Sequence, residues 1–231
     1  MNLIDQNAQS AQTAWQAQRA ANGLDMLREQ AAKSGIAVST RRFMFLRHGE
    51  TEGNAQKVFQ SADISLNPRG REQALAAAQV LQQHPVQRIY ASTMARAHQT
   101  AVIVGDVCNL TPNPEPGLRE RSFGDLIGTS STQLDWRVSP PNGEDLREFV
   151  ARAQGGLEAA LSHGEDTLVV AHGGNLYVLA FSLGIELTPD MVQNATPLVF
   201  SWSDPGWQVS PIQPDQDGRA RTGSVLRNSG W

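Results

Sequence analysis

The segment Phe43-Met44-Phe45-Leu46-Arg47-His48-Gly49-Glu50-Thr51 joins an apolar run to a polar ending. The apolar residues predict a buried β-strand, and Arg47, His48 and Gly49 follow directly at its carboxyl end. Glycine lets the chain turn away there without a side chain in the entrance. Open α/β sheets bind ligands outside the carboxyl ends of their strands. A cation and an imidazole in that position favour an anionic ligand, above all a phosphoryl group.

A second segment repeats this arrangement more than a hundred residues later. Leu168-Val169-Val170-Ala171 is apolar without alternation, which is typical of a strand buried on both faces, and His172-Gly173-Gly174 follows it. The chain between and around these segments alternates expected strands with expected helices. That alternation predicts an α/β fold, a three-layer α/β/α sandwich with a mostly parallel central sheet.

The expected elements follow from apolar periodicity and turn residues. Strands are expected at 42–46, 88–91 and 167–171, with a terminal hairpin at 198–202 and 207–209. Helices are expected at 70–83, 93–108 and 144–161, and a further one carries Leu176, Leu179, Ala180 and Leu183. The first of these helices should turn Ala74, Leu75, Ala78 and Leu81 inward, and Ser92 or Thr93 should cap the second. The proline-rich stretch 111–117 is expected to be a crossing segment.

Composition indicates one soluble globular domain of 41–212, flanked by two different ends. The 231 residues are 40% apolar and 18% charged, with a net charge of −4, which gives no support for a nucleic-acid or membrane partner. Residues 1–40 are rich in Ala and Gln and predict a helical extension, and 213–231 read as a polar tail. One cysteine, Cys108, excludes an intrachain disulfide and indicates a reducing compartment. Without an apolar span or a signal sequence, a cytoplasmic location is expected.

Four motifs, in order along the chain, carry the chemistry. They are Arg47-His48-Gly49-Glu50-Thr51 with Asn54, then Ser92-x-x-x-Arg96-Ala97, then Leu118-x-Glu120-x-x-x-Gly124, and His172-Gly173-Gly174. This set resembles the histidine phosphatase superfamily, also called the phosphoglycerate mutase-like family, over roughly residues 41–210. The resemblance implies a phosphoglycerate mutase-like fold, with His48 as a nucleophile that becomes phosphohistidine and Glu120 as the proton donor.

The residue types fit phosphoryl transfer on chemical grounds as well. Arg47 and Arg96 carry planar guanidinium groups that match phosphate oxygens and stabilise the charge of the transition state. Neutral imidazole is a nucleophile near pH 7, and neighbouring arginines disfavour its protonation, so His48 suits that role. His172 and the Asn54 amide add donors. Thr51 and Gly173 complete the expected phosphate-binding set, and neither a metal nor another cofactor is required.

Several assignments stay open at this point. Glu50, Glu115 and Asp125 are carboxylates close in sequence to Glu120, and Glu50 is expected to order its own loop instead. Arg119 and Arg121 either reach a second anionic group of the substrate or lie in solvent. Family members commonly have glycine where Gln60-Ser61 follows Phe59 here. That departure leaves the shape of the leaving-group pocket undetermined.

Three functions compete: a phosphatase acting on a small phosphorylated metabolite, a cofactor-dependent phosphoglycerate mutase, and a non-catalytic phosphate-binding module. Nucleophile, cation clamp and acid together disfavour the module. Only 52 positions separate Glu120 from His172, which leaves no room for the long insertion of the family's mutases. Pro-Pro-Asn-Gly-Glu-Asp at 140–145 resembles a segment of its phosphatases. A phosphatase is therefore expected, and a homodimer is conceivable through the terminal strands and residues 1–40.

Overall fold

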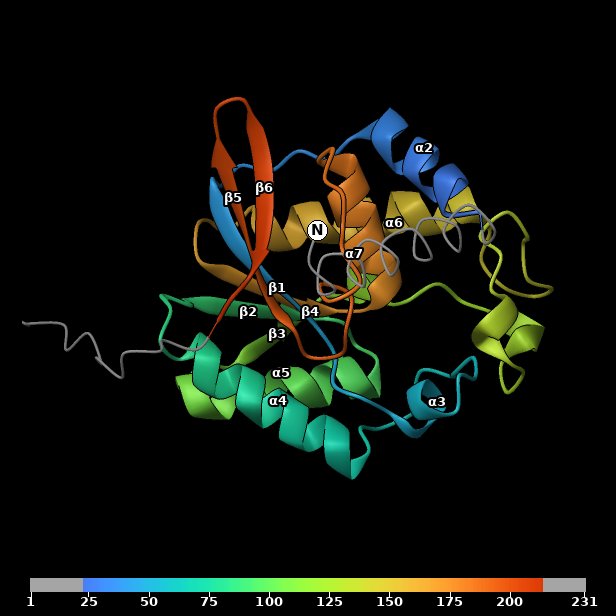
Figure 1. The fold of residues 1–231 in the computed structure, drawn as a ribbon, viewed down its shortest axis with the longest axis horizontal. Coiled ribbons are helices and arrows are strands. Elements are labelled where there is room, and N and C mark those ends of the chain that lie inside the picture. The colour runs from blue at the N-terminus through green and yellow to red at the C-terminus, as the bar shows by residue number, and fades with distance from the viewer. Residues whose placement is uncertain (1–22, 214–231) are drawn as a thin grey trace, which may run out of the picture.

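The computed structural model describes residues 23–213, and they form three layers around one sheet (Figure 1). The sheet has six strands in the order β3-β2-β4-β1-β5-β6. Their bounds are β1 (Arg42–Arg47), β2 (Arg88–Ala91), β3 (Pro112–Pro114), β4 (Thr167–Ala171), β5 (Pro197–Ser203) and β6 (Gly206–Pro211). β1 to β4 run parallel to one another, while β5 pairs antiparallel with β1 and forms an antiparallel hairpin with the edge strand β6. The predicted sandwich with a mostly parallel sheet is confirmed.

The alternation of side chains along β1 divides the core in two. Phe43 and Phe45 pack on one face of the sheet, and Met44 and Leu46 pack on the other, all four fully buried. A strand in the middle of a covered sheet buries both faces, which explains why its sequence is a continuous apolar run. β1 and its parallel neighbour β4 therefore form the rigid centre of the molecule.

Two helices cover one face of the sheet and three cover the other (Figure 1). The first group is α4 (Pro68–Leu81) and α5 (Ala95–Cys108), and the second is α2 (Leu24–Ser34), α6 (Leu146–Leu161) and α7 (Gly173–Ser182). A short helix, α3 (Glu52–Ala55), follows β1. Single 3₁₀ turns lie at Pro116–Leu118, Gly124–Leu126 and Ser131–Gln133. Both faces of the sheet are covered, as parallel strands require.

Two local expectations were wrong. Leu75 of α4 is 45% exposed, because its neighbours Ala74, Ala77 and Ala78 already make the close contact with the sheet and with α5. Neither Ser92 nor Thr93 caps α5, since the helix begins at Ala95. The stretch 111–117 contains the edge strand β3, which proline permits because an edge strand need not donate from both sides.

The N-terminal helix α2 lies against the domain rather than apart from it. Leu24, Leu27 and Ala31 of α2 are buried in the same core as α6 and α7. Gln154 of α6 is itself buried and donates from Nε2 to the Ala31 carbonyl at 2.9 Å. The remainder of the predicted N-terminal extension, 1–22, and nearly all of the predicted tail lie outside the described residues.

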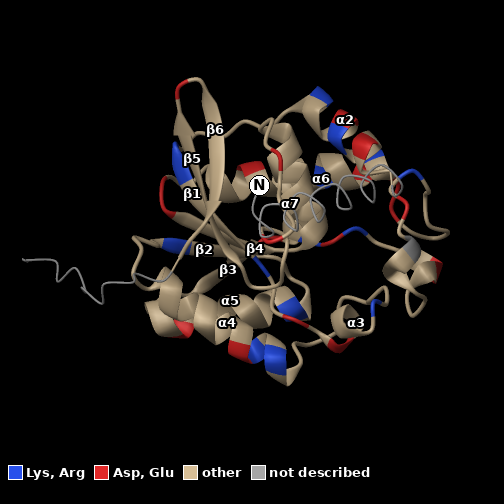
Figure 2. Ribbon diagram, in the orientation of Figure 1, with Lys and Arg blue, Asp and Glu red and all other residues tan. Residues whose placement is uncertain are grey.

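Charges on the outer surface are mixed in sign. Both basic and acidic residues lie on α2 and on α4 (Figure 2). Within residues 23–213 no helix is long and apolar enough to cross a membrane.

Candidate active site

The carboxyl ends of β1, β2 and β4 meet at one edge of the sheet. Arg47 is in register with Ala171, and the His48 N–H donates to the Ala171 carbonyl at 3.0 Å. The Ser92 N–H donates to the Val170 carbonyl, also at 3.0 Å. Parallel pairing thus brings three motifs that are distant in sequence to one place. The positions of Arg47-His48 and His172 directly after two predicted strands had indicated such an arrangement.

The two histidines form a buried pair. Their ring centroids lie 5.0 Å apart with the rings edge to face, and neither side chain has more than 3% of its surface exposed. Nδ1 of His48 lies 2.7 Å from the Gly49 carbonyl oxygen. A carbonyl can only accept, so Nδ1 carries the proton and Nε2 keeps its lone pair. His48 is therefore held in the tautomer that a nucleophile at Nε2 requires.

His172 is oriented by a hydroxyl group. Its Nε2 lies 2.8 Å from Oγ of Ser92, which is itself fully buried. Nδ1 of His172 is buried and has no hydrogen-bond partner in the described structure. A buried polar atom without a partner is costly, so this nitrogen is a natural contact for a ligand.

Arg47 and Arg96 are buried cations held by neutral groups. Arg47 donates from Nη1 to the Val192 carbonyl at 2.6 Å, and Arg96 donates from Nη1 to the Ser61 carbonyl at 2.9 Å. The Nε atom of each arginine is buried without a partner. Among residues 23–213, neither guanidinium forms a salt bridge with a carboxylate. Two cations left in this state match the charge of one bound oxyanion.

Burial and positive charge set the protonation of this group. Burial lowers the pKa of His48 well below its ordinary value, and Arg96 and Arg47 lower it further. Burial likewise lowers the pKa of His172, with Arg96 and His48 adding to the shift. Burial also lowers the pKa of both arginines, while the Glu120 carboxylate opposes that shift. In the ligand-free protein both imidazoles are consequently neutral near pH 7.

Glu120 reaches the cavity from the other side of the sheet edge. Its Oε2 accepts from the Gly174 N–H at 3.0 Å, and its Oε1 accepts from the Arg121 N–H at 2.9 Å. A Cβ at position 174 would lie 2.2 Å from Oε1, so only glycine admits the carboxylate there. The first turn of α7 therefore fixes the carboxylate near both histidines, with the positive end of the helix dipole beside it.

The other carboxylates weighed against Glu120 are engaged elsewhere. Glu50 accepts from Asn67 Nδ2 at 3.0 Å, which agrees with a role in ordering its loop. The Glu115 side chain accepts from the Gly117 N–H, and that of Asp125 accepts from Asn142 Nδ2. Of these four carboxylates only Glu120 lines the cavity.

Asn54 faces the cavity and Thr51 lies behind it. The Asn54 Oδ1 atom accepts from the Thr51 N–H at 3.2 Å and from Asn194 Nδ2 at 3.3 Å, which leaves Nδ2 to donate to a ligand. Thr51 is fully buried, caps α3 and does not line the cavity, so it positions Asn54. Gln60, where the family commonly has glycine, lines the cavity, and its side-chain amide lies 2.6 Å from the Thr51 hydroxyl.

The cavity has a volume of about 350 Å³ and two contrasting sides. The sheet side carries Arg47, His48, Asn54, Arg96, Glu120, Gly173 and Gly174. The loop side carries Val58, Phe59, Phe123, Leu134 and Trp136, and Tyr177 and Val192 complete the wall. Of the predicted site residues, His172 and Thr51 lie just behind this surface.

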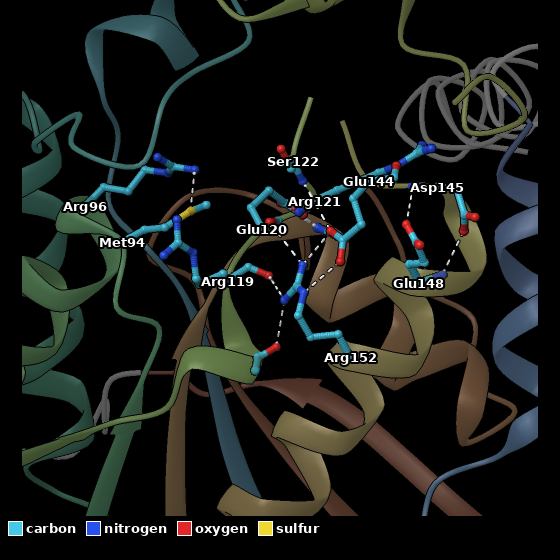
Figure 3. Close-up of polar contacts among 12 residues, drawn as sticks. Met94, Arg96, Arg119, Glu120, Arg121, Ser122, Glu144, Asp145, Glu148 and Arg152 are labelled. Atoms are coloured by element: carbon cyan, nitrogen blue, oxygen red, sulfur yellow. Dashed lines mark hydrogen bonds and ion pairs between the residues drawn. The ribbon is translucent and has the colours of Figure 1, made fainter. Parts of the chain in front are cut away.

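Arg121 and Arg152 hold the loop side in place (Figure 3). Arg121 is 2% exposed and donates to the carbonyls of Glu144 at 3.0 Å and Val138 at 3.0 Å. Arg152 pairs with the Glu144 carboxylate at 2.7 Å and donates to the carbonyls of Gly117 and Arg119. The expectation that Arg121 binds substrate or lies in solvent was wrong, because loop carbonyls take its donors.

Two supporting residues carried no signal that sequence reasoning used. Asn194 donates from Nδ2 to the His48 carbonyl at 2.9 Å, from a loop more than a hundred residues away. Thr100, on the inner face of α5, accepts from the Gly49 N–H at 3.1 Å and donates to the Arg96 carbonyl at 2.8 Å. Ser92 lay in a recognised motif and was interpreted as a helix cap.

Comparisons with known proteins agree with this geometry. The model of a family described as the histidine phosphatase superfamily (branch 1) matches residues 43–212. The chain is 36% identical over 180 residues to agropine synthesis reductase of Rhizobium rhizogenes; the match covers 72% of this chain and 41% of that protein, so the chain spans about two fifths of its length. It is 33% identical over 167 residues to the glucosyl-3-phosphoglycerate phosphatase of Mycobacterium tuberculosis (strain H37Rv), covering 62% of this chain and 75% of the relative.

A solved structure of the mycobacterial glucosyl-3-phosphoglycerate phosphatase, in complexes with VO₃, superposes with a TM-score of 0.62 at 28% identity. The match covers 75% of this chain and 98% of that one. The shared core is thus nearly the whole of that protein.

Proposed function

This chain belongs to the histidine phosphatase superfamily, and from that premise we propose that it hydrolyses a small phosphomonoester through a phosphohistidine on His48. One observation carries the proposal: two buried arginines and His48 line one cavity, His172 packs against His48, and Nε of each arginine and Nδ1 of His172 lack hydrogen-bond partners among the described residues. A phosphoryl group satisfies those donors and balances the buried positive charge. The phosphatase among the relatives, and its complexes with VO₃, support the same chemistry.

The first half-reaction transfers the phosphoryl group to the enzyme. The lone pair of His48 Nε2 attacks phosphorus, a P–N bond forms, and the P–O bond to the alcohol breaks in line with it. The departing alkoxide takes a proton from Glu120 in its carboxylic acid form and leaves as the alcohol. Arg47, Arg96 and the Asn54 amide bind the equatorial oxygens, where negative charge is spread in the transition state.

The second half-reaction returns the enzyme to its starting state. A water molecule gives a proton to the Glu120 carboxylate as its oxygen attacks phosphorus, the P–N bond breaks, and inorganic phosphate leaves. Glu120 thereby regains the proton for the next cycle. Its carboxyl group is suited to both steps because the Gly174 N–H fixes its position at the cavity wall.

Replacing the nucleophile tests the proposal. His48→Ala should lower kcat for p-nitrophenyl phosphate by at least about 10³-fold while leaving the unfolding transition in place. The matched control is His98→Ala, since His98 is an exposed histidine on α5. Radiolabelled substrate should leave an acid-labile, alkali-stable label on the wild-type chain and none on His48→Ala. Full activity of His48→Ala would eliminate the mechanism.

The fate of the phosphoryl group separates the competing functions. Incubation with 3-phosphoglycerate and 2,3-bisphosphoglycerate should form no 2-phosphoglycerate, whereas p-nitrophenyl phosphate should release inorganic phosphate. Formation of 2-phosphoglycerate as the main product would make the protein a mutase. Saturable phosphate binding without turnover of any ester would make it a phosphate-binding module.

A further inference from the structure

The loop side of the cavity presents an aromatic wall, formed by Phe59, Phe123 and Trp136. These side chains have only 4–9% of their surface exposed, and that remainder faces the cavity they line. The Phe59 and Phe123 ring centroids lie 4.4 Å apart, and Trp136 stacks on Phe149 at 5.9 Å. A wall of this kind offers flat apolar contact and few hydrogen bonds.

The aromatic wall is preformed. The Phe59 N–H donates to the Thr129 carbonyl at 3.0 Å, and the Phe59 carbonyl accepts from Gly128 at 2.9 Å. Arg121 lies 5.7 Å from the Trp136 ring centroid, behind the wall, while its donors hold the loop carbonyls. A surface fixed by its own backbone loses little conformational entropy when a ligand binds.

The wall lacks a cation for a second anionic group. Among the described residues that line the cavity, the only arginines or lysines are Arg47 and Arg96, which the phosphoryl group occupies. Arg121 donates its hydrogen bonds to backbone carbonyls. Arg152 forms an ion pair with Glu144, as Figure 3 shows. A carboxylate on the alcohol half would lie between aromatic rings and the Glu120 carboxylate, with neutral side chains such as Gln60 and Ser131 but no further cation to balance it. A charge that is taken out of water without a counter-charge is disfavoured.

We propose that the alcohol half of the substrate is uncharged and presents a flat apolar face, in first place an aromatic ring, which packs on Phe59, Phe123 and Trp136. This inference rests on the proposed function and narrows its substrate class. The cavity of about 350 Å³ is near the lower end of the roughly 300–1,000 Å³ of small-molecule sites, so a single ring system fits better than a polymer. Phosphorylated hydroxy acids, which carry a carboxylate, are poor substrates on this argument.

Matched esters test the substrate class on the wild-type protein. 2-Phenylethyl phosphate and 3-phosphonooxypropanoate are both esters of primary alcohols, so differences in leaving-group reactivity are small. We expect kcat/KM to be at least about tenfold higher for the phenyl ester, a difference of about 1.4 kcal/mol. Equal or higher kcat/KM for the carboxylate ester would overturn the substrate class and leave the proposed hydrolysis standing.

A variant of the wall links the preference to the structure. Phe123→Leu should lower kcat/KM for 2-phenylethyl phosphate at least fivefold more than for ethyl phosphate, which has no ring to pack on the wall. Trp202→Ala is the control, since Trp202 is an aromatic residue of β5 that is 43% exposed and does not line the cavity. An equal loss on both esters for Phe123→Leu, or the same change of ratio for Trp202→Ala, would contradict the proposal.

Binding of non-hydrolysable analogues decides the question even if no ester turns over. Calorimetry should give a dissociation constant at least about tenfold lower for 3-phenylpropylphosphonate than for 4-phosphonobutanoate. That result without turnover would refute the proposed hydrolysis and support the aromatic ligand. Equal or tighter binding of 4-phosphonobutanoate would overturn the inference in either case.

Discussion

Two pairs of arginines near the cavity differ in what balances them. Arg121 and Arg152 donate to loop carbonyls, and Arg152 also pairs with Glu144. Arg47 and Arg96 have one carbonyl partner each, no carboxylate partner among residues 23–213, and a buried Nε with no acceptor. The contacts that Arg47 and Arg96 make in the folded protein do not compensate for the desolvation of their charges. A buried cation whose donors all have acceptors supports the structure, whereas a buried cation with a donor that lacks an acceptor marks the place of a ligand.

The largest expected effect is the loss of activity when Arg96, whose Nε lacks an acceptor, is replaced. Arg96→Met should lower kcat/KM by at least about 10³-fold, roughly 4 kcal/mol, because the transition-state charge loses a bidentate donor. The free energy of unfolding without ligand should stay level or rise, since a buried unpaired charge is removed. Steady-state kinetics and urea unfolding check both. A large loss of stability with activity retained would reverse the assignment of the two pairs.

The complementary substitution is Arg121→Met. Here the free energy of unfolding should fall by about 3 kcal/mol, because buried carbonyls in the loop lose their donor. The kcat/KM for ethyl phosphate should change less than about tenfold, which is less than for Arg96→Met. Urea unfolding with unchanged stability would show that Arg121 is not a structural cation.

Two helical glycines, one in α7 and one in α6, allow a test of the Glu120 position. Gly174→Ala should lower kcat by about 10²-fold, since its Cβ would lie 2.2 Å from Glu120 Oε1 and 2.8 Å from Phe149 Cζ. Gly155→Ala in α6 is the matched control, because a Cβ at that helical glycine would have no atom within 4 Å. Similar kinetics for the two variants would argue against the role of Glu120.

The smallest expected effect is a pH dependence of stability. Folding lowers the pKa of His48 and His172 below the value of about 6.5 that a histidine has in the unfolded chain. At pH values below about 6.5 the unfolded chain therefore binds more protons than the folded protein does. The free energy of unfolding is therefore highest above that pH and falls as the pH is lowered, by about 1 kcal/mol for each histidine between pH 6.5 and 5.5. A His48→Asn/His172→Asn double variant should lose this part of the slope. An identical slope would show that the two imidazoles take up protons as readily in the folded protein as in the unfolded chain.

Much of the fold followed from local patterns. The runs around Phe45 and Val169 could only be strands buried on both faces, and the periodic apolar positions of α6 could only be a helix against a sheet. Leu75 shows the limit of the method: its position on the helix face was clear, but small neighbours brought that face too close to its partners to leave room for leucine. Which apolar residue is exposed depends on packing between elements.

The candidate site, like the fold, was predicted from the sequence in part, and the rest of it was decided by the tertiary structure. Residue type and order, together with the family resemblance of the motifs, singled out Arg47, His48, Arg96, Glu120 and His172, because phosphoryl transfer demands a nucleophile, cations and an acid at the ends of parallel strands. The tautomer of His48, the Ser92 contact to His172 and the engaged state of Arg121 were decided by tertiary structure. A sequence lists which groups can donate or accept, but a donor's partner depends on what lies within about 3 Å of it, and segments far apart in the chain supply that neighbour only after folding.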